Sequence, residues 1–204
     1  MAERFLDRVY DLEKASETEL LYADFADRYE AEVAGAGYVT PERCAQALAE
    51  FVDDTAAPLL DMGCGTGLSG LALRASGFDT IDGIDLTDEM LARAAEKHIY
   101  RDLRQTDAAD PLPFEPGTHA HVAAIGLFSP SHAPGSTIDE VLSYLQPGGC
   151  FVFSLNDHAL EDPSYEGAIM NWADHGAVEV LFREHGPHLP GEDLFATVYV
   201  LRSR

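Results

Sequence analysis

The chain has 204 residues, of which 36 are acidic and 13 are Lys or Arg, and its formal net charge is −23. Lys and Arg on phosphate groups supply most of the non-specific affinity for nucleic acids, so this charge disfavours DNA or RNA as a partner. It also disfavours an anionic membrane surface, and no run of 18 apolar residues predicts a transmembrane helix. Whether the charge only keeps the protein soluble or attracts a cationic substrate stays open.

One domain is the simplest organisation for this length, which is sufficient for a full sheet with helices on both faces. The chain starts with Met1-Ala2-Glu3-Arg4, without the basic end and apolar core of a signal peptide. Its three cysteines, Cys44, Cys64 and Cys150, lie in apolar or glycine contexts without metal-like pairing. We therefore expect reduced thiols in a cytoplasmic protein.

Two helices are predicted first along the chain. Apolar and aromatic residues recur at helical spacing between Glu17 and about Val33. Thr40 and Pro41 then supply an N-cap and a first-turn proline for a helix that runs through Phe51.

Short apolar runs then alternate with helical stretches. Strands are predicted at about residues 57–62, 80–85, 100–106, 122–127 and 150–155, and helices at 66–75, after the N-cap Thr87, at 137–145 and at 162–173. The run from Val122 to Leu127 is continuously apolar, as in a central parallel strand buried on both faces. Val178 to Arg183 and Phe195 to Leu201 are extended runs separated by His185-Gly186-Pro187 and Pro190-Gly191, which predicts a hairpin.

The segment between the first strand and its helix carries the clearest signal. Apolar residues run into Asp61, and Gly63, Gly65 and Gly67 follow at alternate positions. Glycine has no Cβ, so this backbone can pass close to a ligand and adopt positive φ. Asp85 ends the next strand, where a carboxylate can accept hydrogen bonds from a ribose diol. The spacing predicts a crevice for a ribose-bearing cofactor.

A dinucleotide is the weaker hypothesis for that cofactor. The dinucleotide fingerprint has the form G-x-G-x-x-G directly after a strand, and Leu68 stands where its third glycine belongs. A literal match at Gly65, Gly67 and Gly70 begins two residues too late. Asp61 would repel a pyrophosphate, whereas it suits a ligand with a nearby cation, such as the amino group of a methionine moiety. A tight glycine turn in another α/β protein remains the other alternative.

Three segments carry a resemblance to a known family. Residues 61–67 (DMGCGTG) resemble the first motif of the class I S-adenosylmethionine-dependent methyltransferases, residues 84–91 their acidic second motif, and Thr106-Asp107-Ala108 the segment that meets the adenine edge. More narrowly, residues 22–30 and 83–100 resemble the small methyltransferase-like proteins of the Williams–Beuren critical region and their bacterial relatives.

The resemblance, which extends from about Leu21 to the last strand, implies an α/β fold. Its features are a Rossmann-like, seven-stranded, mostly parallel sheet with helices on both faces, a C-terminal antiparallel hairpin and an N-terminal helical lid. Within the single domain 1–204, residues 1–54 would form the lid and residues 55–204 the cofactor-binding core.

The resemblance also implies S-adenosylmethionine as cofactor, S-adenosylhomocysteine as product, and a set of contacts. The expected cofactor-binding residues are Asp61, Gly63, Cys64, Gly65, Asp85, Leu86, Met90, Asp107, Ala108, Ile125, Tyr22 and Tyr29. Asp61 would hold the methionine ammonium directly or through water, and Asp85 the ribose hydroxyls. Leu86 and Met90 would flank the adenine, with Asp107 and Ala108 at its polar edge. Ile125 and Gly126, at the end of the fourth strand, would face the place of the methyl group.

Several of these residues also have a purely structural explanation. Asp85 can be an ordinary surface aspartate at a strand end, and Met90 a core gap-filler. Tyr22 and Tyr29 share one helical face, and packing as core aromatics beneath the lid is as well supported as a contact with the cofactor. Cys64 has no base nearby in sequence, which disfavours a nucleophilic role.

The acceptor pocket is expected on loops and element starts after strand ends. Candidates for it are Tyr38, Phe128, His132, Asn156, His158 and Tyr165, with a general base in the segment 156–158 as one hypothesis; no catalytic residue is assigned. The pairs His119/His121, expected on one strand face, and His185/His188, expected in a turn, lack the cysteines or H-E-x-x-H frame of a metal site. Relatives usually carry an aromatic residue and Asp at positions 119 and 120, so the start of the fourth strand is in question.

The sequence thus predicts methyl transfer from S-adenosylmethionine to a small-molecule acceptor, without nucleic-acid or membrane partners. The acceptor lone pair, the methyl carbon and the leaving sulfur must be collinear, so the protein mainly supplies alignment. An oxygen acceptor needs a base, whereas a thiolate or free amine does not. A non-catalytic S-adenosylmethionine-binding protein is one alternative, and a nicotinamide-dependent oxidoreductase, which Asp61 and Leu68 disfavour, is the other. The acceptor and the oligomeric state are not determined by the sequence.

Overall fold

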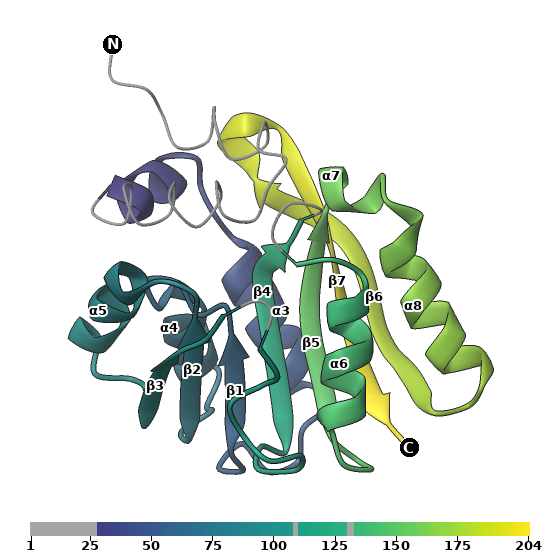
Figure 1. Ribbon diagram of the computed structural model, residues 1–204. Coiled ribbons are helices and arrows are strands. Elements are labelled where there is room, and N and C mark those ends of the chain that lie inside the picture. The colour runs from purple at the N-terminus through teal and green to yellow at the C-terminus, as the bar shows by residue number, and fades with distance from the viewer. Residues whose placement is uncertain (1–27, 108–109, 130–132) are drawn as a thin grey trace.

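The computed structural model describes residues 28–107, 110–129 and 133–204 and is built around a seven-stranded sheet (Figure 1). The strand order is β3-β2-β1-β4-β5-β7-β6. The strands are β1 Leu59–Met62, β2 Ile81–Asp85, β3 Asp102–Gln105, β4 His121–Phe128, β5 Cys150–Asn156, β6 Val178–Leu189 and β7 Leu194–Ser203. The helices are α3 Thr40–Ala49, α4 Leu68–Ala75, α5 Asp88–Glu96, α6 Ser136–Tyr144, α7 Asp157–Leu160 and α8 Pro163–Asp174, and residues 28–35 are also helical.

The sheet is parallel from β1 to β5 and antiparallel at its far edge. β7 pairs antiparallel with both β5 and β6, which closes the sheet with a hairpin. This confirms the predicted Rossmann-like, mostly parallel sheet and its C-terminal antiparallel hairpin.

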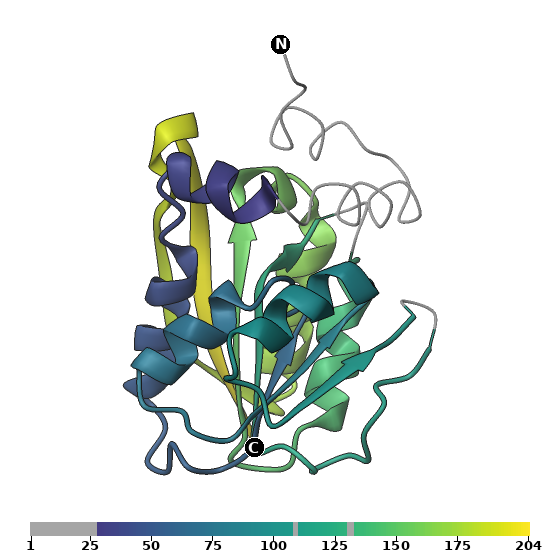
Figure 2. The ribbon, with the colours of Figure 1, turned by 90° about the vertical axis from the view of Figure 1, so that its left-hand side faces the viewer.

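Helices cover both faces of the sheet, as the turned view shows (Figure 2), and a hydrophobic cluster fills the space on each face. In β4, Val122 and Ala124 pack into the cluster under α6 and α8, whereas Ala123 and Ile125 pack into the cluster under α3 and α4. Side chains alternate between the two faces of a strand, so a strand covered on both sides must be apolar throughout. That requirement explains the continuous apolar run that marks this central strand.

The carboxyl ends of the parallel strands meet at one edge, at the top of Figure 1. Asp61 in β1 pairs with Gly83 in β2 and with Ala123 in β4, so β1 lies between these two strands and all three point the same way. Helix 28–35 lies above this edge. The topology therefore collects the residues that follow β1, β2 and β4 under one N-terminal helix.

The predicted N-cap of α3 is wrong by one residue. Val39 is the N-cap residue, and Thr40 is the first helical residue. The Thr40 hydroxyl instead bonds Nδ1 of His188 at 2.7 Å, which ties α3 to the hairpin. A long-range partner has replaced the local capping bond.

The predicted break of the hairpin at residues 185–187 is also wrong, because β6 continues through His185, Gly186 and Pro187 as far as Leu189. β6 is the edge strand, where a proline without an N–H is tolerated. Register shifts between Val180 and Phe182 and between Pro187 and Leu189 absorb the irregular residues. The actual turn is the short 3₁₀ helix Pro190–Glu192.

The start of β4 is held by a buried polar network. β4 begins at His121, so His119 precedes the strand and does not share its face as predicted. His119 Nε2 lies 2.8 Å from Asp82 Oδ2, and its Nδ1 lies 2.6 Å from the Tyr144 hydroxyl. Asp82 also accepts from Arg101. His119 therefore has a structural role at the opposite edge of the sheet from the carboxyl ends of the strands.

Within the three described ranges, no helix is long and apolar enough to cross a membrane.

Candidate cofactor site

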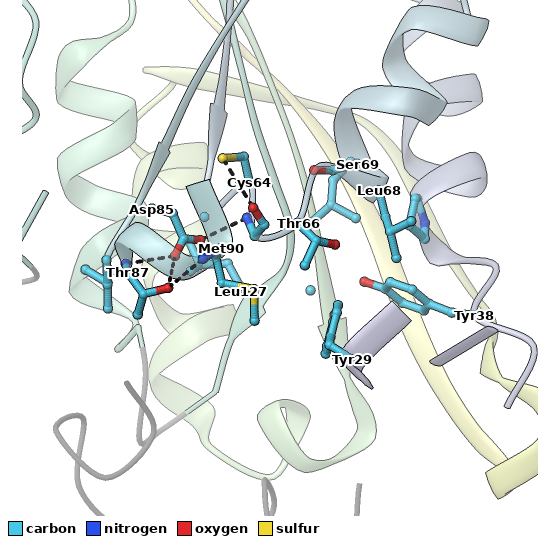
Figure 3. A pocket seen from close by; sticks show the side chains of 16 residues that line it. Tyr29, Tyr38, Cys64, Thr66, Leu68, Ser69, Asp85, Thr87, Met90 and Leu127 are labelled. Carbon is cyan, nitrogen blue, oxygen red and sulfur yellow. Dashed lines mark hydrogen bonds between the residues drawn. The ribbon is translucent and has the colours of Figure 1, made fainter. Parts of the chain in front are cut away.

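A pocket opens at the carboxyl ends of β1, β2 and β4 (Figure 3). It is lined by the glycine turn, the start of α5, the end of β4 and the N-terminal segment: Tyr29, Tyr38, Pro41, Gly63, Cys64, Gly65, Thr66, Leu68, Ser69, Asp85, Leu86, Thr87, Met90, Ile125, Gly126 and Leu127. Eight of the twelve residues predicted to bind a cofactor are in this set.

The turn after β1 has the backbone that its glycines predict. Gly63, Gly65 and Gly67 all have positive φ, at 69°, 52° and 93°. The N–H groups of Gly63 and Cys64 both donate to the Ile84 carbonyl at 2.9 Å, which fastens the turn to β2. A Cβ on Gly63 would lie 2.6 Å from Leu127, whereas one on Gly65 would meet no atom within 4 Å. Gly65 thus presents bare backbone to open space.

Asp85 is tied to that turn by its own carboxylate. Oδ2 accepts from the Gly65 N–H at 2.9 Å, and Oδ1 accepts from the Thr87 N–H at 3.1 Å. Burial raises the pKa of Asp85, and these hydrogen bonds oppose the rise. The Thr87 hydroxyl also donates to Oδ1 at 3.4 Å, so about one of the roughly four acceptor directions of the carboxylate remains for a ribose hydroxyl. A carboxylate acceptor at this position fits the hydroxyl donors of the ribose of a nucleoside cofactor.

Thr87 and Met90 continue the site along α5. The Thr87 hydroxyl accepts from the Met90 N–H at 3.4 Å, which confirms the predicted N-cap. Met90 is 1% exposed and still lines the pocket, so it serves both as core and as pocket wall.

Asp61 lies beneath the turn and not in the pocket lining. It is fully buried, and its Oδ2 accepts from the Ser69 hydroxyl at 2.6 Å and from the Tyr100 hydroxyl at 2.7 Å. Its Oδ1 is buried and has no hydrogen-bond partner among the residues that the structure describes. Burial raises the pKa of this carboxyl to about 6. The expected contact with the methionine ammonium stays a prediction, with Oδ1 as the acceptor atom that is left.

Tyr100 is a residue of the site's support that the sequence motifs do not indicate. Its ring and hydroxyl fill a space bordered by Gly67, Gly70 and Gly83, where an added Cβ would lie 3.3, 2.3 and 3.0 Å from the nearest Tyr100 atom. Gly70, the last glycine of the literal dinucleotide match, is therefore explained by packing against Tyr100.

Cys64 contributes backbone to the pocket, and its side chain packs away from it. The residue is 3% exposed and belongs to a cluster with Leu91 and Ala94. Burial raises the pKa of its thiol well above the ordinary value. The structure thus agrees with the expectation that Cys64 is not a nucleophile.

Asp107 lies in a second cavity that adjoins the first. Gly63, Asp85, Leu86 and Leu127 line both cavities, and Asp107 lines the second together with Thr106, Asp110 and Leu112. The arrangement places Asp107 next to the Asp85 end of the crevice, as an adenine contact requires. Ala108 and Tyr22 lie outside the described residues.

Of the residues predicted for the acceptor pocket, some line the pocket and others lie in the core. Tyr38 lines the pocket. The predictions for Phe128 and Tyr165 are wrong, because both side chains are buried in the core with their ring centroids 5.7 Å apart. β4 extends as far as Phe128, one residue beyond the predicted strand, and alternation along the strand places Phe128 on the same face as Val122 and Ala124.

The remaining candidates lie on or near α7. Asn156 caps α7 through the Ala159 N–H, and His158 is an exposed residue of that short helix. Neither lines one of the two cavities. His132 lies outside the described residues.

The histidines of the second pair, His185 and His188, are accounted for by hydrogen bonds. His188 is in β6 and not in a turn, and it bonds Thr40. His185 Nδ1 lies 3.2 Å from the Thr197 hydroxyl. In the described ranges no group of three or more His, Cys, Asp or Glu side chains is arranged to hold a metal ion.

Helix 28–35 is anchored across the site. Glu30 pairs with Lys97 at the end of α5 at 2.5 Å, and Lys97 packs on the side of the turn where Gly67 lies. Tyr29, the neighbour of Glu30, lines the pocket. This ion pair therefore joins the N-terminal helix to the end of α5.

Comparison with known proteins agrees with this site. Residues 59–149 match the family model described as "Methyltransferase domain". The solved structure titled "Crystal Structure of the [4+2]-Cyclase SpnF" superimposes with a TM-score of 0.68 at 18% identity, covering 93% of this chain and 97% of that one. Residues 59–149 are therefore similar to a methyltransferase domain, and the superposition shows a shared fold.

Among individual proteins, the chain is similar to Methyltransferase-like protein 27 of Homo sapiens. They are 32% identical over 145 residues, which cover 69% of this chain and 59% of the human protein. The 18S rRNA (guanine-N(7))-methyltransferase of Bos taurus is 39% identical over 66 residues, covering 32% of this chain and 23% of that protein. The chain thus spans less than two thirds of the length of these relatives.

Proposed function

We propose that this protein transfers a methyl group from S-adenosylmethionine to a small-molecule acceptor. The observation that carries the proposal is the hydrogen bond between the Gly65 N–H and Asp85 Oδ2. It brings the main chain of Gly65 and the Asp85 carboxylate, which still has an acceptor direction left, together at neighbouring strand ends. Such an arrangement suits a nucleoside that carries an amino acid.

In this proposal each part of the cofactor is bound by residues of the pocket and its support. Asp85 accepts from the ribose hydroxyls, Leu86 and Met90 pack on the adenine, and Asp107 accepts from its amino group. Asp61 attracts the methionine ammonium from beneath the turn. The cofactor, when bound, supplies a methyl group already activated by a sulfonium, so the protein's main task is to align the acceptor and exclude water.

A small molecule is favoured over a nucleic acid by charge. The net charge of −23, with 13 Lys and Arg residues, opposes binding to a phosphate backbone. The likeness to the bovine enzyme named for 18S rRNA covers 32% of this chain. A likeness of that extent carries no argument for an RNA acceptor here.

The composition of the pocket favours an acceptor that needs no base. Among the described lining residues of the first cavity, Asp85 is the only carboxylate, and no His, Lys or Arg is present. Because Asp85 is committed to the ribose, we propose a free amine or a thiolate as nucleophile. The same observation suits the second candidate function, binding of S-adenosylmethionine without transfer.

Calorimetric titration tests the cofactor first. We expect S-adenosylmethionine and S-adenosylhomocysteine to bind and NADH and NADPH to leave the protein unchanged; binding of a nicotinamide cofactor alone would contradict the proposal. Release of S-adenosylhomocysteine in the presence of amine, thiol, hydroxyl and carboxylate acceptors, and of an RNA oligonucleotide, then separates enzyme from binding protein. Binding without release for any acceptor favours the second candidate.

We further propose that the protein resides in a reducing compartment such as the cytoplasm. Cys44, Cys64 and Cys150 are all free and buried, and free thiols are typical of that environment.

A further inference from the structure

The end of β4 contains an opening that the rest of the strand lacks. Gly126 has a φ of 69° and is exposed, whereas the preceding residues of β4 are buried. Its N–H donates to the Ser154 hydroxyl on β5 at 2.9 Å, which holds the irregular backbone in place. The pocket therefore reaches the main chain of β4 at this residue.

The Tyr38 hydroxyl lies directly over this opening. A Cβ on Gly126 would be 2.4 Å from the Tyr38 hydroxyl oxygen and 3.6 Å from Cζ, so the hydroxyl, and not the ring, is nearest to the strand. In Figure 3 the Tyr38 ring enters the pocket with its hydroxyl pointing toward the centre. Only a glycine at position 126 allows this approach.

Tyr38 is held in this position by the hairpin. The Tyr38 N–H donates to the Val33 carbonyl at 3.0 Å, and the Val39 N–H donates to the His188 carbonyl at 3.1 Å. The rings of Tyr38 and His188 meet edge to face with centroids 5.2 Å apart, and His188 is in turn bonded to Thr40. Two backbone bonds and one ring contact thus orient the tyrosine before any ligand arrives.

We propose that Tyr38 is a catalytic residue whose hydroxyl oxygen contacts the transferable methyl group above Gly126. This inference rests on the proposed function. C–H groups next to a sulfonium are polarised, and a hydroxyl oxygen is a suitable acceptor for a weak C–H···O contact. In the transfer, the acceptor lone pair forms the new bond to the methyl carbon while the carbon–sulfur bond breaks and its electron pair stays on sulfur. Tyr38 neither gives nor takes a proton.

A binding measurement tests the assignment without turnover. Tyr38→Phe removes the oxygen and keeps the ring. We expect the variant to bind S-adenosylmethionine about two- to fivefold more weakly, the size of one weak contact. Its Kd for S-adenosylhomocysteine, which has no methyl group, should stay within about twofold of the wild-type value. An equal change for both ligands, or no change for either, overturns the proposal.

Tyr199→Phe is the matched control. The Tyr199 hydroxyl donates to Glu166 at 2.6 Å and is absent from both cavity linings, so its loss should not alter the ratio of the two Kd values. The ¹³C-methyl resonance of labelled S-adenosylmethionine, bound to the wild type and to Tyr38→Phe, gives a second readout and should move between them; an unmoved resonance contradicts the contact.

Gly126→Ala serves if Tyr38→Phe does not fold. Its Cβ would displace the Tyr38 hydroxyl, so the same selective loss is expected, and an unchanged ratio overturns the assignment. Failure of the wild type to bind S-adenosylmethionine would instead reject the proposed function, so the two failures are distinguishable.

Discussion

The Tyr100 hydroxyl donates a hydrogen bond of 2.7 Å to Oδ2 of Asp61, and this bond joins the segment before β3 to the end of β1. The bond runs beneath the glycine turn, in a space that Gly67, Gly70 and Gly83 leave open. A buried carboxylate, two hydroxyl donors and three glycines therefore form the support of the cofactor pocket.

Tyr100→Phe should weaken this support. Loss of a hydrogen bond to a charged group that stays buried costs about 1.5–3 kcal/mol of folding free energy, and we expect several-fold weaker cofactor binding because the turn loses a fixed neighbour. Urea denaturation and calorimetry measure the two effects. Tyr165→Phe is the control: its hydroxyl donates to the neutral Ala133 carbonyl at 2.8 Å, and its loss should cost about 1 kcal/mol without changing affinity. Equal affinities for wild type and Tyr100→Phe would contradict the role.

Asp61 predicts a pH dependence of stability. Burial raises its pKa from 3.8 to about 6, so between these values the folded state holds a proton that the unfolded state has released. The contribution of this group to stability therefore falls as the pH rises from about 4 to 6 and stays low above that. The shift of about two units corresponds to roughly 3 kcal/mol.

Asp61→Asn should remove this dependence. The difference in unfolding free energy, wild type minus variant, is expected to decline by about 2–3 kcal/mol between about pH 4 and pH 7. Urea denaturation at several pH values measures this difference. Because the wild type and the variant share all other carboxylates, the contributions of those groups to the pH dependence cancel. A difference that stays constant, or that increases with pH, is incompatible with a raised pKa.

Asp85→Ala should weaken binding of S-adenosylmethionine by tenfold or more and leave the fold intact. The carboxylate supplies an acceptor for the ribose diol, and it also orients the Gly65 and Thr87 N–H groups. Calorimetry gives the affinity, and circular dichroism checks the fold. Asp79→Ala removes an exposed carboxylate paired with Arg74 and should change neither quantity. Wild-type affinity in Asp85→Ala would remove Asp85 from the site.

Gly65→Ala separates backbone strain from blockage of the pocket. The residue has a φ of 52°, and an added Cβ would meet no atom within 4 Å, so the alanine costs roughly 1–2 kcal/mol of stability through left-handed strain alone. Because Gly65 lines the pocket, the methyl group should also reduce cofactor affinity by tenfold or more.

Gly148→Ala provides the comparison for that variant. Gly148 has a φ of 89°, again with no atom within 4 Å of an added Cβ, and it lies in the turn before β5, away from both cavity linings. It should lose similar stability, measured by urea denaturation, and keep wild-type affinity. Comparable losses of affinity in both variants would show that strain, and not blockage, controls binding.

The order of elements and the core of the cofactor pocket were predictable from local patterns. Gly63, Gly65 and Asp85 stand at the ends of apolar runs, and parallel strands place such ends at one edge of a sheet. The continuous apolar run of β4 marked the centre of the sheet for the same reason. These features depend on neighbours in the sequence and on a regular topology.

Phe128 and Tyr165 show where this reasoning stops. Phe128 was expected after the fourth strand but is the last residue of that strand, and it packs in the core beside Val122 and Ala124. Thr40 is likewise of a residue type that is preferred at N-caps, yet its hydroxyl bonds His188, 148 positions away in the chain. Contacts between distant segments outweigh a local preference of about 1 kcal/mol.

The sequence alone therefore determined the class of fold and the nature of the cofactor crevice, because strand alternation, glycine conformation and charge are properties of short segments. Tertiary structure decided that Asp61 lies beneath the turn, that Tyr100 supports it, and that Tyr38 faces Gly126. Tyr100 is 39 positions from Asp61, and Tyr38 is tens of residues from Gly126, so these contacts follow from the packing of the complete core.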